Sequence, residues 1–102
     1  MMNMNIQALM REAQKMQKDL EKTQKDLENT DYTGESSLVS VVFSGNMEMK
    51  SISIKCEDNF DQEDIEMLED MILLAVNDAI NKINKDKESK MGKYGKGLSG
   101  LM

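Results

Sequence analysis

The 102-residue sequence contains no proline, no histidine and no tryptophan, and it has a single cysteine. Without histidine, one chain cannot build a Ser-His-Asp triad or a Cys-His dyad. One cysteine cannot supply a zinc cage or a disulfide framework. We therefore expect no enzyme, no metal, no cofactor and no small-molecule substrate.

Aromatic side chains are scarce as well, at 4% of the sequence, whereas methionine occurs 11 times. A core built from so few rigid rings and so many flexible thioethers is thin for one short domain. Small scaffolds of this kind are commonly stabilised by oligomerisation. We therefore expect more than one copy of the chain in the functional unit.

Long apolar runs are absent: the longest is Met71 to Val76, whereas a membrane span needs about 18 residues. The N-terminal MMNMNIQALM has no positively charged start and leads into a charged helical pattern rather than a signal-peptide cleavage region. Cys56 fits a reducing compartment, where an unpaired thiol in a strand acts as a small hydrophobe far more often than as a nucleophile. The expected location is cytoplasmic, without a membrane partner.

Residues 5–29 predict a long helix, because this stretch lacks glycine and proline and repeats apolar or small residues with strict 3-4 spacing. The repeat forms a narrow coiled-coil seam. We name it the apolar seam, and its members are Ile6, Leu9, Ala13, Met16, Leu20, Thr23 and Leu27. At 1.5 Å per residue the helix is roughly 37 Å long, so we expect part of it to project from the fold.

The middle of the chain predicts strands at residues 38–44 and 47–56, with a further short strand at 30–36. Residues 38–43 are rich in β-branched side chains, and apolar and polar residues alternate from Ile52 onward as in a half-buried strand. Gly45 and Asn46 between the two longer runs indicate a hairpin, because both residue types tolerate positive φ.

A second helix is predicted over residues 61–88. Asp61 and Asp64 provide a capping signal, and a wide apolar face indicates packing on the sheet. Residues 89–102 contain four glycines and are expected to form a flexible tail. Residues 1–88 would then be a single α+β domain.

The net charge of −6 argues against a nucleic-acid partner until the chain is divided into segments. Residues 61–88 hold nine acids and three bases, whereas the first helix sorts its basic residues, spaced 4, 3, 4 and 3, onto the face opposite the seam. We call this set the basic stripe, and its members are Arg11, Lys15, Lys18, Lys22 and Lys25. The alternative is a solvated coiled-coil exterior with intrahelical ion pairs such as Glu21 to Lys25.

Lys82 and Lys85 begin a second basic run near the end of the second helix. They are candidates for additional DNA contacts. The alternative is that they complement the negative end of the helix dipole.

The order of these motifs resembles the YbaB/EbfC family of bacterial nucleoid-associated proteins. The resemblance spans LMREAQKMQKDLEKTQKDLE, the TGES turn, LVSVVFSGNMEMKSISIK, EDIEMLEDMILLAVNDAINKI and the MGK of the glycine-rich end. It implies an α-β-β-β-α protomer with a small antiparallel sheet and two long helices, and a homodimer whose helices project like tweezers. It also implies binding of double-stranded DNA in the nucleoid, which assigns phosphate contacts to the basic stripe.

One alternative of another class is a prefoldin-like helical-arm chaperone or scaffold, in which long Met-bearing helices hold a partner protein. Such an arm should keep a narrow 3-4 stripe in both helices. The broad apolar face from Ile65 to Ile80 favours a helix packed on a sheet instead. The leading hypothesis is therefore a dimeric protein that binds the DNA backbone with low sequence specificity and affects nucleoid organisation and gene expression.

Overall fold

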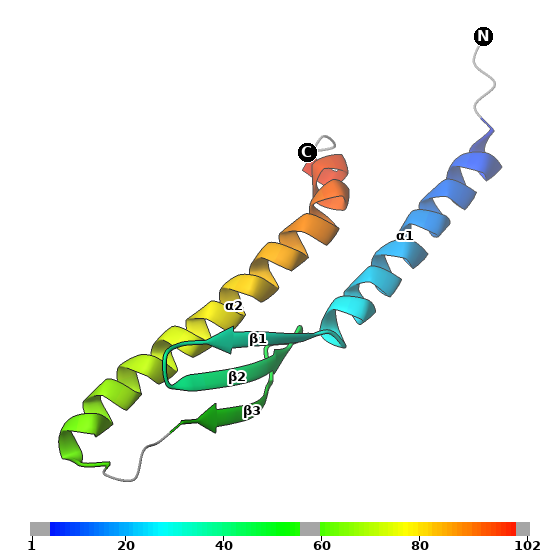
Figure 1. Cartoon of the computed structure of the whole chain (residues 1–102). Helices are drawn as coiled ribbons and strands as arrows, with labels where there is room; N and C mark the ends of the chain where they lie inside the picture. Colours follow the sequence, from blue (N-terminus) through cyan, green and yellow to red (C-terminus); the bar gives the residue numbers. More distant parts are fainter. Residues whose placement is uncertain (1–4, 56–59, 100–102) are drawn as a thin grey trace.

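The computed structural model describes residues 5–55 and 60–99, with side chains described as far as residue 92. Its elements follow the order α1 (Ile6–Glu28), β1 (Asp31–Glu35), β2 (Val39–Ser44), β3 (Met49–Ile54) and α2 (Gln62–Ser99). The predicted α-β-β-β-α order is confirmed, and the molecule is elongated, with principal extents of 79 × 23 × 13 Å. Both α1 and the later part of α2 extend past the same end of the sheet (Figure 1). Within the described residues, neither helix is long and apolar enough to cross a membrane.

Helix α1 begins and ends where its local chemistry predicts. The Asn5 side chain accepts a hydrogen bond from the backbone N–H of Gln7 at 3.1 Å, which caps the first turn. At the other end the backbone N–H of Asn29 donates to the Lys25 carbonyl at 3.0 Å. Nearly the whole helix is exposed, and only Leu27 is buried.

The sheet is antiparallel with the strand order β1-β2-β3, so β1 confirms the short first strand. Asp31 pairs with Ser44 and Val41 pairs with Ile52, with a bulge between Val42 and Phe43. The hairpin is confirmed, but the positive φ falls on Met47 (68°) and on no described glycine. Gly45 is needed for close packing instead, because a Cβ there would lie 1.7 Å from the Leu27 carbonyl oxygen.

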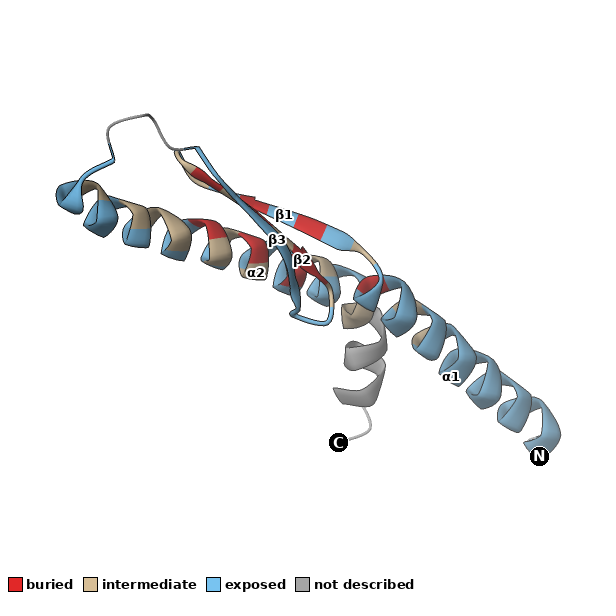
Figure 2. Cartoon of the chain, turned by 90° about the horizontal axis from the view of Figure 1, so that it is seen from below, coloured by how far each residue is buried: buried red, intermediate tan, exposed pale blue. Residues whose placement is uncertain are grey.

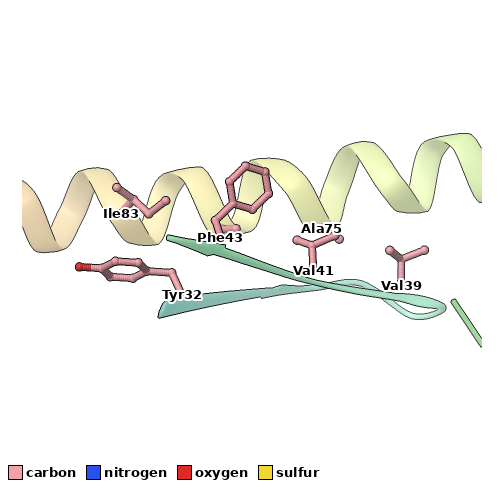
Figure 3. Packing of buried hydrophobic residues seen from close by; sticks show 7 residues of the cluster. Tyr32, Val39, Val41, Phe43, Ala75 and Ile83 are labelled. Carbon is pink, nitrogen blue, oxygen red and sulfur yellow. The ribbon is translucent and has the colours of Figure 1, made fainter. Parts of the chain in front are cut away.

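The core lies between α2 and the inner face of β1 and β2 (Figure 3). Alternate residues of β2 are buried against small or branched residues of α2, as a two-layer α/β arrangement requires. The buried cluster consists of Tyr32, Val39, Val41, Phe43, Ala75, Ala79 and Ile83. Close contact between the layers depends on Gly34, where a Cβ would lie 2.0 Å from the Ala75 carbonyl oxygen.

Strand β3 was predicted to be half-buried, and in the protomer this is wrong: all six of its residues are exposed. The reason is that α2 packs on β1 and β2, whereas β3 is exposed along its length (Figure 2). Ile52 and Ile54 share the inner face with their partners Val41 and Val39, yet they remain 45% and 38% exposed. Cys56, predicted at the end of this strand, lies outside the described residues.

Helix α2 starts with the predicted capping arrangement. The Asp61 carboxylate accepts from the backbone N–H groups of Glu63 and Asp64, and the Asp64 carboxylate accepts from the Asp61 N–H in return. The sequence predicts that this helix ends at residue 88, whereas in the structure it continues to Ser99. Without proline the segment has nothing that blocks a helix, and glycine only weakens one. The expectation of a flexible tail therefore differs from the structure over residues 89–99, and residues 100–102 lie outside the described part.

Candidate nucleic-acid interface

The basic stripe forms one continuous exposed face of α1. Each of its five members lies within Ile6–Glu28, and each is exposed. Their 4-3-4-3 spacing keeps them on the side opposite Leu27, which is the residue that packs α1 against the rest of the fold. The stripe therefore faces away from α2 and toward solvent.

No intrahelical ion pair neutralises the stripe among the described residues. The three ion pairs of the described chain join Lys50 to Asp31, Lys82 to Asp78 and Lys90 to Asp86. The alternative pairing of Glu21 with Lys25 is not among them. An open hollow of about 450 Å³ beside the stripe is lined by Lys18, Glu21, Lys22, Lys25, Asp26 and Asn29. The second half of the stripe thus offers three ammonium groups around one recess.

Acidic residues flank the stripe on both sides. Glu12, Asp19 and Asp26 recur every seven residues along one flank, and Glu21 and Glu28 lie on the other. All five are exposed. They reduce the local positive potential without occupying the stripe itself.

Lys82 has a structural role in this fold. Its Nζ donates to the Thr33 carbonyl oxygen at 2.7 Å and lies 3.3 Å from the Asp78 carboxylate. The side chain therefore ties α2 to β1. Lys85 is exposed, and its positive charge helps to stabilise the ionised form of Asp78. The structure does not bring this pair into line with the basic stripe, because Lys82 faces β1 while the stripe faces away from α2.

Asp78 forms a second contact between α2 and β1. Its carboxylate accepts from the backbone N–H of Glu35 at 3.0 Å. This hydrogen bond, together with Lys82, lowers the pKa of Asp78 below its ordinary value. The i,i+4 spacing of Asp78 and Lys82 was a readable signal for the ion pair, whereas the contact with the β1 backbone depends on the fold.

A second link of the same kind joins Tyr32 to Asp86. The Tyr32 hydroxyl donates to the Asp86 carboxylate, and burial together with this hydrogen bond raises the pKa of Tyr32 to about 12. The same hydrogen bond, followed by Lys90, lowers the pKa of Asp86. These polar links fix β1 along α2 and thereby hold the base from which α1 departs.

The described part of the chain contains no group of three or more histidine, cysteine or acidic side chains that could hold a metal ion. What it offers is a row of cations on an exposed helix. Such a row suits electrostatic contact with phosphate groups.

Comparison with known proteins places this geometry in context. The sequence model of the YbaB/EbfC DNA-binding family matches residues 1–98. A nucleoid-associated protein of Enterococcus faecalis is 45% identical over 99 residues, which cover 95% of this chain and 94% of that protein. A nucleoid-associated protein of Ligilactobacillus salivarius is 43% identical over 103 residues, which cover 99% and 98% of the two chains.

The fold also has a solved counterpart. A crystal structure of an uncharacterized protein from Helicobacter pylori superposes with a TM-score of 0.71 and covers 90% of this chain and 98% of that chain. The identity between them is 22%, so this match concerns the fold alone. The family match and the structural match therefore both cover nearly the full length of the chain.

Proposed function

Because the chain belongs to the YbaB/EbfC DNA-binding family, we propose that it is a nucleoid-associated protein that binds double-stranded DNA as a homodimer through phosphate contacts. Its relatives from Enterococcus faecalis and Ligilactobacillus salivarius carry the name nucleoid-associated protein. Binding of this kind has low sequence specificity and acts on nucleoid organisation and gene expression.

The observation that carries the proposal is the exposed basic stripe. From Arg11 to Lys25 it extends about 21 Å along the helix axis, or roughly two-thirds of one turn of duplex DNA. Each phosphate that a lysine or arginine neutralises releases condensed counterions, which drives binding at low salt. The net charge of −6 does not oppose this, because the surplus acid lies in residues 61–88, which hold nine acids and three bases.

The composition of the stripe accounts for low specificity. It contains four lysines and one arginine, without an aromatic side chain that would stack on bases. Contacts to phosphates position a protein on the duplex but carry no direct sequence information. Lys82, which binds the Thr33 carbonyl, makes at most a minor contribution to this surface.

The homodimer is supported by the apolar surface that the protomer leaves open. Met49, Ile52 and Ile54 are between 38% and 45% exposed on β3. One flank of α2 bonds to β1 through Asp78 and Lys82. Elsewhere on α2, Ile65 is 44% exposed and Ile72, Val76 and Ile80 are half-buried. A second copy that covers this surface by two-fold symmetry buries both exposed regions at once.

Dimerisation doubles the basic surface. Two copies of α1 present two basic stripes, so phosphates on one duplex meet up to ten cations. The tweezer-like arrangement implied by the family places these helices as two projecting arms.

A gel-shift assay with duplex DNA at about 50 mM salt tests the proposal. The native protein should shift the duplex, and the triple variant Lys18→Glu/Lys22→Glu/Lys25→Glu should not. The matched control Lys50→Glu/Lys55→Glu/Lys87→Glu has the same change in net charge away from the stripe and should retain most of the binding. Equal loss in both variants, with dimers intact by light scattering, would show that only total charge matters.

A further inference from the structure

The apolar seam is left open along most of α1. Leu27 at its end is buried and Leu20 is half-buried, whereas residues 6–19 are all exposed (Figure 2). Within that stretch the seam residues Leu9 and Met16 are 48% and 59% exposed. A helix draws most of its stability in a protein from packing its apolar face. Two heptads of the seam are therefore available to a partner.

The spacing of the seam indicates the kind of partner that covers it. Apolar residues at alternating intervals of 3 and 4, without a wider apolar face, are the pattern by which one helix packs on another in a coiled coil. Packing on a sheet uses a broader apolar face, such as the one that α2 presents to β1 and β2. The open part of the seam therefore fits a second helix with the same narrow stripe.

The residues that flank the seam decide between the two orientations of an identical partner helix. One flank holds the acidic Glu12 and Asp19, and the other holds the uncharged Met10 and Gln17. In an antiparallel pair of α1 helices the two acidic flanks face each other and repel. In a parallel pair each acidic flank faces the uncharged flank of the partner, which brings Glu12 to Gln17, a hydrogen-bond donor. The flanks therefore favour a parallel pair.

The basic stripe stays open when two seams meet. Its members lie on the face of α1 opposite the seam, which is the face farthest from a partner helix. Two paired helices consequently carry their stripes on opposite outer sides. One such pair presents cations to two separate segments of duplex DNA.

We propose that residues 6–19 of α1 pair in parallel with the same residues of a chain in a second dimer, and that this contact bridges two duplexes. The inference rests on the proposed binding of DNA by the dimer. Each dimer holds one duplex through its basic stripes, and the seams join two such dimers. Two heptads form a weak pair in dilute solution, so the contact forms where DNA holds many copies close together.

Capture of a second duplex tests the bridge. A duplex that is fixed on beads and loaded with the native protein should retain a free, labelled duplex. Leu9→Gln/Met16→Gln should reduce the retained duplex by about tenfold or more, because it removes apolar contacts between the seams. The control Leu74→Gln/Met67→Gln makes the same two substitutions at exposed positions of α2 and should retain as much duplex as the native protein.

Fluorescence anisotropy with a duplex long enough for one dimer separates bridging from binding. The native protein and both variants should bind this short duplex equally. A native protein that binds it but captures no second duplex would overturn the bridge and leave DNA binding intact, and so would undiminished capture by the seam variant. Absence of binding to the short duplex would overturn DNA binding and the bridge together.

Disulfide trapping tests the parallel orientation without disrupting the seam. In a Cys56→Ser background on DNA, Met16→Cys should form a disulfide between two chains, because identical seam residues meet only in a parallel pair. The control Gln14→Cys is equally exposed but lies off the seam, and it should oxidise roughly tenfold more slowly or less. An unoxidised Met16→Cys protein, or equal oxidation of the two variants, contradicts the pairing.

Discussion

At the residue scale, two glycines show how differently the same residue type is used. Gly34 is buried where β1 crosses α2, and a Cβ there would meet the Ala75 carbonyl oxygen at 2.0 Å and the Ala79 nitrogen at 2.6 Å. Gly92 on α2 has no atom within 4 Å of an added Cβ. The first glycine permits close packing of two layers, and the second only weakens a helix.

The same substitution at these two positions should therefore have opposite effects. Gly34→Ala should lower the free energy of unfolding by about 1–3 kcal/mol or more, because backbone atoms must move apart. Gly92→Ala should raise it by up to about 1 kcal/mol through helix propensity. Urea unfolding followed by circular dichroism measures both, and an equally stable Gly34→Ala protein would contradict the close approach of β1 to α2.

Asp78 gives a pH-dependent prediction at the same scale. The backbone hydrogen bond from Glu35 and the contact with Lys82 hold its pKa below the ordinary value of 3.8. Because the folded pKa is lowered, its contribution to stability is present above pH 3.8 and is lost as the pH falls through the folded pKa.

Asp78→Asn should accordingly lower the melting temperature at pH 7, and the difference from the native protein should shrink as the pH falls below about 3.8. Thermal melts over a pH series measure this. The control Asp70→Asn removes an exposed carboxylate of the same helix that forms no described ion pair, and it should have little effect at either pH. A difference between native and Asp78→Asn proteins that is constant with pH would exclude the charged state as its cause.

At the scale of elements, the helices and strands follow from local patterns that the sequence displays. The seam and the Asn5 cap define α1, and β-branched residues define β2. Asp61 and Asp64 mark the start of α2. Helix α2 continues past residue 88, where the sequence predicts its end, because glycine only weakens a helix and the segment has no proline to block it.

What the sequence could not provide is the relative placement of elements. Alternation in β3 indicates one apolar face but not whether α2 reaches it, so a half-buried strand was expected where the protomer has an exposed one. Within the site, the basic stripe follows from helical periodicity alone. The engagement of Lys82 with the Thr33 carbonyl depends on a contact between residues far apart in the chain.

Leu27 is the one buried residue of helix α1. Leu27→Ala should lower the free energy of unfolding by about 2–5 kcal/mol, as truncation of a buried leucine does. Leu9→Ala, at a site that is 48% exposed, should change it by no more than about 0.5 kcal/mol. Urea unfolding of the two variants compares them directly, and similar losses would show that the N-terminal half of the seam is also covered.

At the scale of the whole molecule, the open apolar surface of β3 and α2 predicts assembly. Ile52→Asp places a charge in the surface that a second copy would cover, so the dimer should dissociate. Ser51→Asp changes the neighbouring residue on the opposite face of β3 and should leave the dimer intact. Light scattering distinguishes the two outcomes, and a dimeric Ile52→Asp protein would place the interface elsewhere.

The central claim is that two copies of the basic stripe bind DNA through its phosphates. The most direct measurement is the slope of log K against log salt, obtained by fluorescence anisotropy with a labelled duplex. Five cations on each of two α1 helices predict a slope of about −9, and Lys18→Gln/Lys22→Gln/Lys25→Gln should reduce its magnitude by about 5, at 0.9 per phosphate contact. A slope near zero for the native protein, or an unchanged slope in the variant, would contradict the account.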